Sequence, residues 1–407
     1  MFLVGAVSFR GCRAVVRLLG GFLPSFRAAP APNTVQSWLL RVGLHELRRP
    51  KEQAGDWVFI IDHTIQLGAW KCLLIVGVRG SVWERLSEPL SHHDVTFITL
   101  EPVRKSDGER VFQQLQEATR KVGVPRAILS DHGSDIARGA RKFREKHPQT
   151  LVLCDIAHQT AIALKRELST DPVWRAFVKH CGQTQPKVKQ TELGHLAPPT
   201  QKVKGRYMNL GPLIGWGKRM LKLVDTPESD RPSDVPLARL DEKFGWIRDF
   251  RQALAEWEDL QAVNQHVLDY ARKKGYHAQA AAELRQRLQA IAGTTRGQRM
   301  AASLAQFVAT QSQAVRRRES LPASSEVIES LIGKGKRMLG QHSRGGFTKM
   351  ILGMAASVVR ITQQSVREAL QAVRHADLHA WCKQHLGISL TAQRRRALPL
   401  QSGTKPG

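Results

Sequence analysis

Three carboxylates stand where acidic side chains are able to do chemistry. Asp62 lies inside the apolar run WVFIIDHTIQLG, Asp131 ends RAILSD, and Glu329 lies in SSEVIESLIGKGK. The first two runs are rich in β-branched residues and predict buried strands, while the third has the apolar spacing of a helix. An acid inside an apolar strand is costly to bury without a cationic partner, so Asp62 marks a candidate site. Acids from two strands and a helix are typical of two-metal phosphoryl transfer, in which oxygen ligands hold two magnesium ions about 4 Å apart.

Each acid also has an ordinary structural explanation. Asp62 would be exposed if its strand lay at a sheet edge, and Asp131 lies in SDHGSD, whose residues favour turns. Glu326 lies one turn before Glu329, but it falls in the first helical turn, where an acid complements the helix dipole. Asp155 ends another strand and competes as the third acid, yet it also precedes a helix as an N-cap. Glu329 is the preferred third ligand, with Glu326 and Asp155 as alternatives.

The elements that must position these acids alternate along residues 57–168. Three strands, the first two joined at a turn near Gly68, precede a helix, and strand and helix then alternate. This order predicts an α/β fold, a ribonuclease H-like mixed sheet flanked by helices. The strands are expected at 57–65, 71–79, 94–103, 125–131 and 150–155, and the helices at 107–122, 134–147 and 156–168.

Residues 170–318 have few strand signals and are rich in Ala, Gln, Leu, Arg and Trp. Helices are predicted at 241–263 and 277–293, a basic loop at 183–206 and a Pro/Ser/Asp-rich linker at 226–236. We interpret the region as a mainly α-helical insertion. Its Trp246 and Trp257 fit either core packing, the more ordinary role, or stacking on DNA bases.

The N-terminal region predicts a partial helix-turn-helix unit, with a generic amphipathic helix as the alternative. Residues 34–47 have helical apolar spacing after a cap signal at Pro32–Asn33, and a basic helical segment precedes them. The predicted domains are a DNA-binding remnant at 1–50, the two parts of the core at 51–169 and 319–385, the insertion at 170–318 and a basic tail at 386–407.

Charge indicates the class of partner. The chain has 62 Lys and Arg against 35 Asp and Glu, a formal net charge of +27, which favours polyanions such as nucleic acid. A solvated basic surface or a ribosome-associated protein would carry the same charge. The five scattered cysteines contain no CxxC pair for zinc or a redox disulfide. Arginines interrupt the apolar N-terminus well before the roughly 20 residues of a membrane span, so we expect no membrane partner and a cytoplasmic protein, with a mitochondrial address as an alternative.

Four segments together resemble the DDE-type transposases of bacterial insertion sequences, over about residues 57–170 and 320–360. They are WVFIIDHTIQLGAWKCLLIVGV, ILSDHGSDIARGARKF, LVLCDIAH and SSEVIESLIGKGKRMLGQHSRGGFTKMIL. The resemblance implies that Asp62, Asp131 and Glu329 are the catalytic triad and the ligands of two Mg²⁺ ions, for which Mn²⁺ substitutes. It implies DNA cleavage at element ends and strand transfer into target double-stranded DNA, by a homodimer that associates with the nucleoid when bound to DNA.

The resemblance extends to three further residues. Lys336 fits the basic residue that these enzymes often carry seven positions after the glutamate, and we expect Lys336 and the neighbouring Arg337 to contact DNA. Asp155 and His158 match an Asp-x-x-His element found between the second and third acids.

Two features depart from the family pattern. Almost two hundred residues separate the second and third acids, so an insertion is required, and the N-terminal region is short, as in a truncated copy. A catalytically silent DNA-binding derivative, or a nuclease of the same fold that cuts without joining, is the alternative.

Overall fold

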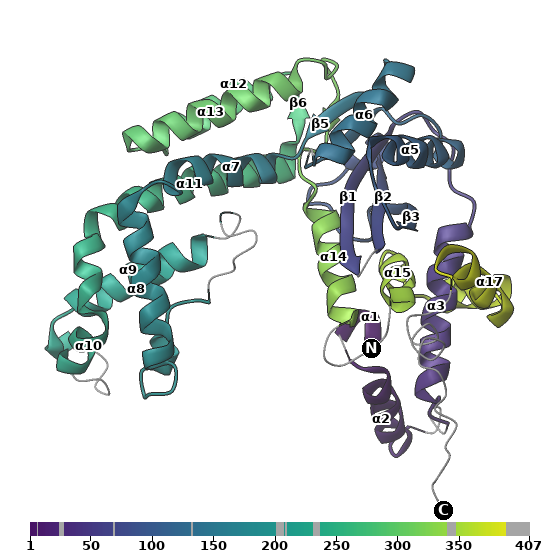
Figure 1. The fold of residues 1–407 in the computed structure, drawn as a ribbon, viewed down its shortest axis with the longest axis horizontal. Coiled ribbons are helices and arrows are strands. Elements are labelled where there is room, and N and C mark those ends of the chain that lie inside the picture. The colour runs from purple at the N-terminus through teal and green to yellow at the C-terminus, as the bar shows by residue number, and fades with distance from the viewer. Residues whose placement is uncertain are drawn as a thin grey trace, which may run out of the picture. The chain divides into compact units, whose positions relative to one another are not determined.

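The computed structural model describes residues 1–5, 7–23, 28–67, 70–131, 133–200, 207, 210–230, 237–339 and 347–387. They form two compact units, which Figure 1 draws and which are treated separately below. The first comprises Met1–Leu86, Leu90–Val152 and the described residues from Ser325 onward, and the second comprises Ser87–Pro89 and Leu153–Ser324. Within the described segments, no helix combines the length and the apolar character needed to cross a membrane.

A five-stranded mixed sheet is the centre of the first unit, as predicted. Its strands follow the order β3-β2-β1-β4-β5, with β1 antiparallel to β2 and parallel to β4. This order and the flanking helices are consistent with the predicted ribonuclease H-like fold. The strands are β1 (Trp57–Leu67), β2 (Trp70–Arg79), β3 (Thr96–Val103), β4 (Ala127–Ser130) and β5 (Leu151–Cys154).

The two faces of β1 have different surroundings. Trp57, Phe59 and Ile61 lie in one hydrophobic core with α5 (Gly108–Val122) and α6 (Ser134–Lys146). Because side chains alternate along a strand, Val58, Ile60 and Asp62 project to the other face. The core therefore fixes the direction in which Asp62 points.

Helix α5 shows how spacing and one glycine position this layer. Its buried residues Val111, Leu115, Ala118 and Val122 recur at three- and four-residue intervals, so one face covers the sheet. The helix ends at Gly123, whose φ of +95° is costly for residues with a Cβ, and a Cβ there would meet the carbonyl oxygen of Ala54 at 2.6 Å.

Helix α3 (Pro32–Arg48) packs within the first unit against helices from the other end of the chain. A Cβ on Gly43 would overlap the backbone of Leu352, so α3 and α15 approach closely, and Arg41 Nε donates to the Val373 carbonyl at 2.6 Å. The predicted helix is confirmed, but Pro32 and Asn33 lie inside it and Ala31 is the N-cap. The helix-turn-helix interpretation stays a prediction. The other elements here are α1 (Phe2–Gly5), α2 (Phe9–Gly20), α4 (Gly80–Trp83), α14 (Glu326–Leu339), α15 (Phe347–Ala356), α16 (Gln363–Ala372) and α17 (His375–His385).

The second unit is mainly helical and contains most of the predicted insertion. Its helices are α7 (Ile156–Leu168), α8 (Pro172–Val188), α9 (Gly211–Asp225), α10 (Leu237–Phe244), α11 (Arg251–Lys274), α12 (Ala280–Gln289) and α13 (Thr295–Ser312), with 3-10 turns at Gly194–Leu196, Glu228–Asp230 and Gly245–Phe250.

Two sequence predictions for this unit were wrong in part. The loop predicted from residue 183 is helical to Val188, through Pro186, because Cys181, Thr184 and Val188 share a buried face that favours continuing the helix. A short antiparallel pair, Tyr276–His277 (β6) with Ser320–Leu321 (β7), was not predicted, and His277 lies in it rather than in the helix expected at 277–293. Residues 201–206 of the predicted loop and 231–236 of the predicted linker lie outside the described residues.

The tryptophans of this unit pack inside it. Trp257 is fully buried, with its ring centroid 4.9 Å from that of Trp174 and 5.1 Å from that of Phe177, so stacking of Trp257 on DNA bases is excluded. Trp246 stacks on His180 at 4.9 Å and donates its Nε1 hydrogen to the Lys243 carbonyl at 3.0 Å. Both residues therefore have packing roles.

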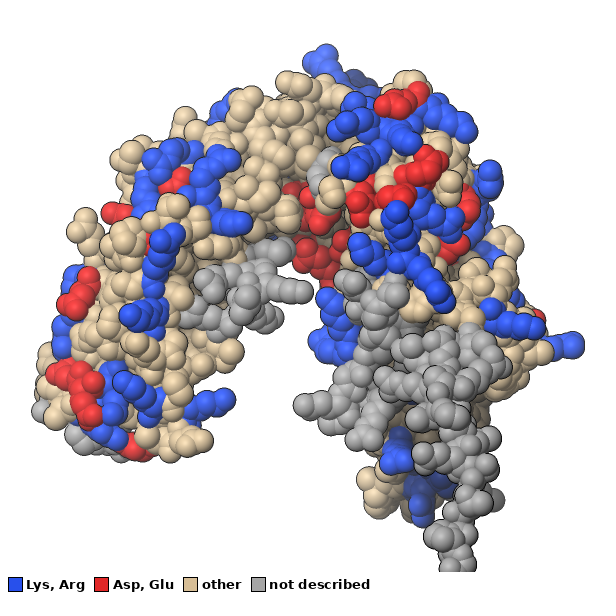
Figure 2. All heavy atoms as spheres, viewed as in Figure 1, with Lys and Arg blue, Asp and Glu red and all other residues tan. Residues whose placement is uncertain are grey.

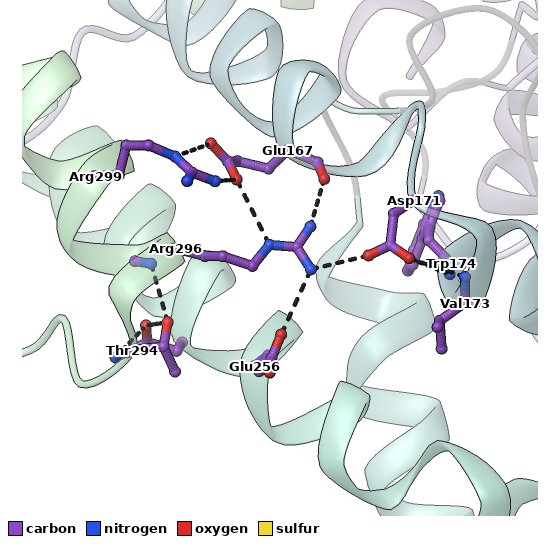
Figure 3. A network of polar contacts seen from close by, with 10 residues as sticks. Glu167, Asp171, Val173, Trp174, Glu256, Thr294, Arg296 and Arg299 are labelled. Atoms are coloured by element: carbon purple, nitrogen blue, oxygen red, sulfur yellow. Dashed lines mark hydrogen bonds and ion pairs between the residues drawn. The ribbon is translucent and has the colours of Figure 1, made fainter.

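An arginine of α13 joins four helices of the second unit (Figure 3). Arg296 pairs with Asp171 of α8 at 2.9 Å and with Glu256 of α11 at 3.5 Å. It also contacts Glu167 of α7 at 3.5 Å, and Arg299 pairs with the same glutamate. Three carboxylates are thus matched by two guanidinium groups.

Candidate active site at three carboxylates

Strand register brings the two aspartates to the same place in the sheet. In the parallel pair of β1 and β4, Val58 lies opposite Ala127 and Ile60 opposite Leu129. The same offset places Asp131, the first residue after β4, level with Asp62. Neighbouring strands are about 4.8 Å apart, so the two acids meet beside one another. Asp131 also accepts a hydrogen bond from the Gly133 amide at 2.9 Å, so the turn role considered for it is present as well.

Helix α14 adds the third acid. Val327, Ile328 and Leu331 are buried on its inner side, while Glu329 is exposed at the edge of that side. The helix contacts β1, and the charge of Glu329 acts on Asp62. The structure therefore brings together the three acids that the sequence predicted, across almost two hundred intervening residues.

Electrostatics around Asp62 are unfavourable to its charge. Burial is the largest effect, followed by the negative charges of Asp131 and Glu329, and together they raise the pKa of Asp62 to about 7. A backbone hydrogen bond from His63 and the positive charge of Lys336 oppose the shift, with smaller effects than these. The negative charge of such a carboxylate is stabilised by any cation that binds next to it.

The oxygen donors of these acids are of the kind that hard divalent cations bind. Among the described residues, no three His, Cys, Asp or Glu side chains converge closely enough to hold a single ion. Magnesium does not require such a cage, because it is commonly held by one or two carboxylates, with water and substrate phosphates completing the shell. An all-carboxylate group with a half-buried, disfavoured charge at Asp62 fits this mode of binding.

The basic side chains of α14 affect two different groups. Lys336 acts on Asp62, as expected from its position two turns after Glu329. Lys334 and Arg337 instead act on His92, whose Nε2 lies 3.0 Å from Ser330 Oγ. Sequence reasoning included Arg337 among the expected DNA contacts but missed Ser330, Lys334 and His92. The spacing of Ser330, Lys334 and Arg337 places them on one helix face and could have been recognised in the sequence. No pattern around His92 indicated that it contacts this face.

The Asp-x-x-His pair lies in the second unit. Asp155 is 2 % exposed and caps α7 by accepting the Ala157 amide hydrogen at 3.0 Å, and its charge acts on Tyr276. His158 is half-buried on the same helix. The N-cap role considered for Asp155 is therefore present, and the predicted site role of the pair stays a prediction. Glu326 begins α14, as expected for an acid of the first turn.

The surface around this site is divided by charge. Figure 2 shows acidic side chains gathered over the region where Figure 1 draws β1 and the start of α14. Lysine and arginine side chains cover the region of the later turns of that helix. An acidic centre beside a basic margin suits a cation-dependent reaction on a polyanion.

Comparisons with known proteins add little. No protein-family model matches this chain, and no curated protein matches its sequence. Among solved structures, the chain is similar to one described as "Drosophila P element transposase strand transfer complex". The identity is 10 %, the TM-score is 0.39, and the match covers 90 % of this chain and 96 % of the other.

Proposed function

We propose that this chain is a DDE-type transposase, which cleaves DNA strands at the ends of a mobile element and joins them to target DNA. The observation that carries the proposal is Asp62, a half-buried carboxyl whose pKa is raised by partial burial and by Asp131 and Glu329. A structural acid normally acquires a cationic partner that favours its charge, whereas Asp131 and Glu329 disfavour the charge of Asp62. Such groups occur at functional sites.

In this proposal Asp62, Asp131 and Glu329 hold two magnesium ions, or manganese in their place. When bound, the ions lower the pKa of water and neutralise charge at the scissile phosphate. The protein's own part is to fix the carboxylates on two adjacent strands and a helix, so that little reorganisation is needed. Lys336, beside Asp62, would contact the DNA backbone.

The proposed reaction consists of two phosphoryl transfers. Water attacks the phosphodiester at the element end and releases a 3′-hydroxyl, which then attacks a phosphodiester of the target in line. A tyrosine nucleophile is disfavoured by the surroundings of two of the three tyrosines. Tyr276 is buried and donates to the Cys154 carbonyl at 2.7 Å, and Tyr270 donates to Glu283 at 3.0 Å. Burial raises the pKa of both phenols.

The partner in this proposal is double-stranded DNA, as element end and as target. The net charge of +27 supports a polyanionic partner. A homodimer is proposed because two element ends must be processed in one complex. The cytoplasm, with association to the nucleoid, is the proposed location.

The test uses the purified full chain with labelled duplexes from the DNA that flanks its own gene, with and without Mg²⁺ or Mn²⁺. Strand-transfer products support the proposal. Cleavage without joining would instead indicate a nuclease, and a shifted but intact duplex a silent DNA-binding derivative.

The third acid is tested by two matched variants, Glu329→Gln and Asp155→Asn. We expect Glu329→Gln to abolish cleavage and joining, and Asp155→Asn to retain part of both. Full activity in Glu329→Gln, with loss in Asp155→Asn, would move the third ligand to Asp155.

A further inference from the structure

Helix α14 presents a second polar face beside the one that bears Glu329 and Lys336. Ser330, Lys334 and Arg337 recur at intervals of four and three residues, so they lie along one side of the helix. His92, from the segment between α4 and β3, reaches Ser330 with Nε2 to Oγ at 3.0 Å. All four residues belong to the first unit.

The segment that carries His92 is held in place from both sides. The neighbouring His93 donates from Nδ1 to the Val358 carbonyl at 3.2 Å. Asp94, the nearest acid in the sequence, accepts the Ser91 amide hydrogen at 2.8 Å and the hydrogen of the Ser91 hydroxyl. The carboxylate of Asp94 is thus engaged inside its own turn, and His92 is presented to α14 by a preformed loop.

Positive charge is concentrated on this face. Burial and the charges of Lys334, His93 and Arg337 lower the pKa of His92, and burial and Arg337 lower that of Lys334. Within the part of the chain that the structure describes, neither Lys334 nor Arg337 forms an ion pair with a carboxylate. By contrast, Lys142, Lys218 and Arg239 on other exposed surfaces each form one.

We propose that His92, Ser330, Lys334 and Arg337 form a binding site for a backbone phosphate of DNA. The inference rests on the proposed function, since it takes DNA as the ligand. A lysine ammonium and an arginine guanidinium are suited to phosphate oxygens, the latter in a bidentate manner. With the proton on Nε2, His92 donates to Ser330, whose own hydroxyl hydrogen is then available to the phosphate.

The position of this site on α14 assigns its role. A helix rises about 1.5 Å per residue, so Lys334 and Arg337 lie roughly 8 and 12 Å beyond Glu329 along the axis. A strand held there passes near the carboxylates without its held phosphate being the one cleaved. The site therefore binds and orients the strand, and contributes to affinity more than to the chemical step.

The test compares Lys334→Gln/Arg337→Gln with the control Arg144→Gln/Arg367→Gln, which removes the same charge from exposed arginines on α6 and α16. Anisotropy of a labelled duplex is measured in EDTA over a range of KCl concentrations, so that no cleavage occurs. Each lost phosphate contact lowers the salt slope by about 0.9, so we expect a loss of about 2 in slope and roughly 30-fold weaker binding at about 0.15 M salt. The control should change the slope by less than about half a unit.

The outcomes separate this inference from the proposed function. If the double variant binds like its control, while wild-type cleaves and joins DNA, the phosphate site is overturned and the function stands. If wild-type binds no duplex, both are overturned. If circular dichroism shows that Lys334→Gln/Arg337→Gln has a lower melting temperature than wild-type, the single variant Arg337→Gln replaces it in the binding test. Arg337 is exposed, so its substitution should not disturb packing. A loss of about 1 in the salt slope is expected for this variant.

Discussion

Two groups of three carboxylates, one in each unit, differ in how their charge is balanced. In the first unit, Asp131 and Glu329 add to the burial of Asp62 and raise its pKa to about 7. In the second, burial would also raise the pKa of Asp171, but hydrogen bonds from Arg296 and from the backbone of α8 outweigh it and lower that pKa (Figure 3).

The difference distinguishes acids whose charge an arginine of the protein balances from an acid whose charge is disfavoured by its neighbours. Arg296 links Asp171 with Glu256 and Glu167, so those carboxylates are stabilised by the protein's own cation. For Asp62, the cation in play is Lys336, and its effect is smaller than that of either neighbouring acid. The second group is complete by itself, and the first is suited to a divalent ion.

The largest expected effect is a loss of DNA cleavage when an acid of the first group is substituted, compared with an acid of the second group. Asp62→Asn should lower metal-dependent DNA cleavage by more than about 100-fold, because even residues that merely support a metal ligand are worth roughly 10- to 100-fold. Asp171→Asn is the matched change in the second unit and should retain most activity. Rates of cleavage in Mg²⁺ at saturating DNA test this, and equal losses in the two variants would remove the distinction.

The free energy of unfolding should depend more on the second group of acids than on the first. Arg296→Met leaves the half-buried Asp171 and Glu256 without their cation, and we expect a loss of about 2 kcal/mol in the free energy of unfolding. Lys218→Met is the control, since its ion pair with Glu258 is exposed and should be worth less than about 1 kcal/mol. Urea unfolding measures both, and a neutral Arg296→Met would show that the network does not stabilise the unit.

The pH dependence of stability without metal gives a prediction of intermediate size. Because the pKa of Asp62 is about 7 when folded and 3.8 when unfolded, the folded state retains the proton more tightly. The resulting stabilisation is fully present below about pH 4 and is lost as pH rises through about 7. In EDTA at pH 8, Asp62→Asn should therefore be more stable than wild-type, by on the order of 2 kcal/mol.

The control for this prediction is again Asp171→Asn, which should destabilise the protein at pH 8, since Asp171 is charged and paired there. Thermal melts at pH 4 and pH 8 with EDTA or Mg²⁺ make the comparison. Mg²⁺ should stabilise wild-type and leave Asp62→Asn unchanged. A destabilised Asp62→Asn at pH 8 would contradict the assignment of Asp62 to a ligand site.

The smallest predicted effect is that of substituting Lys336, the cation whose charge acts on Asp62. Lys336→Gln removes a charge that lowers the pKa of Asp62 and, in the proposed function, a contact to the DNA backbone. We expect cleavage to fall by roughly tenfold, since hydrogen bonds to charged groups are worth about 1.5 kcal/mol. Lys336→Arg should recover most of it, and a loss equal to that of Asp62→Asn would place Lys336 in the chemistry itself.

Most strands and helices of the sheet region could be predicted from the sequence because they depend on local periodicity. The β-branched runs predicted the strands, three- and four-residue spacing predicted α5, α6 and α7, and Asp62 and Asp131 were identified by lying within or directly after such runs. Interactions of a few successive residues decide these features. The helix through Pro186 escaped prediction because burial of Val188 outweighs the local preference of proline.

Only the tertiary structure decided which charges meet. The sequence favoured Glu329 as the third acid, but no local pattern shows that its charge acts on Asp62, or that Arg296 and Arg299 neutralise Glu167. Likewise, no local pattern connects His92 with Ser330, 238 positions away. Pairing over such distances depends on how sheet register and helix packing bring surfaces together, whereas the sequence by itself determined the elements and the residues that they carry.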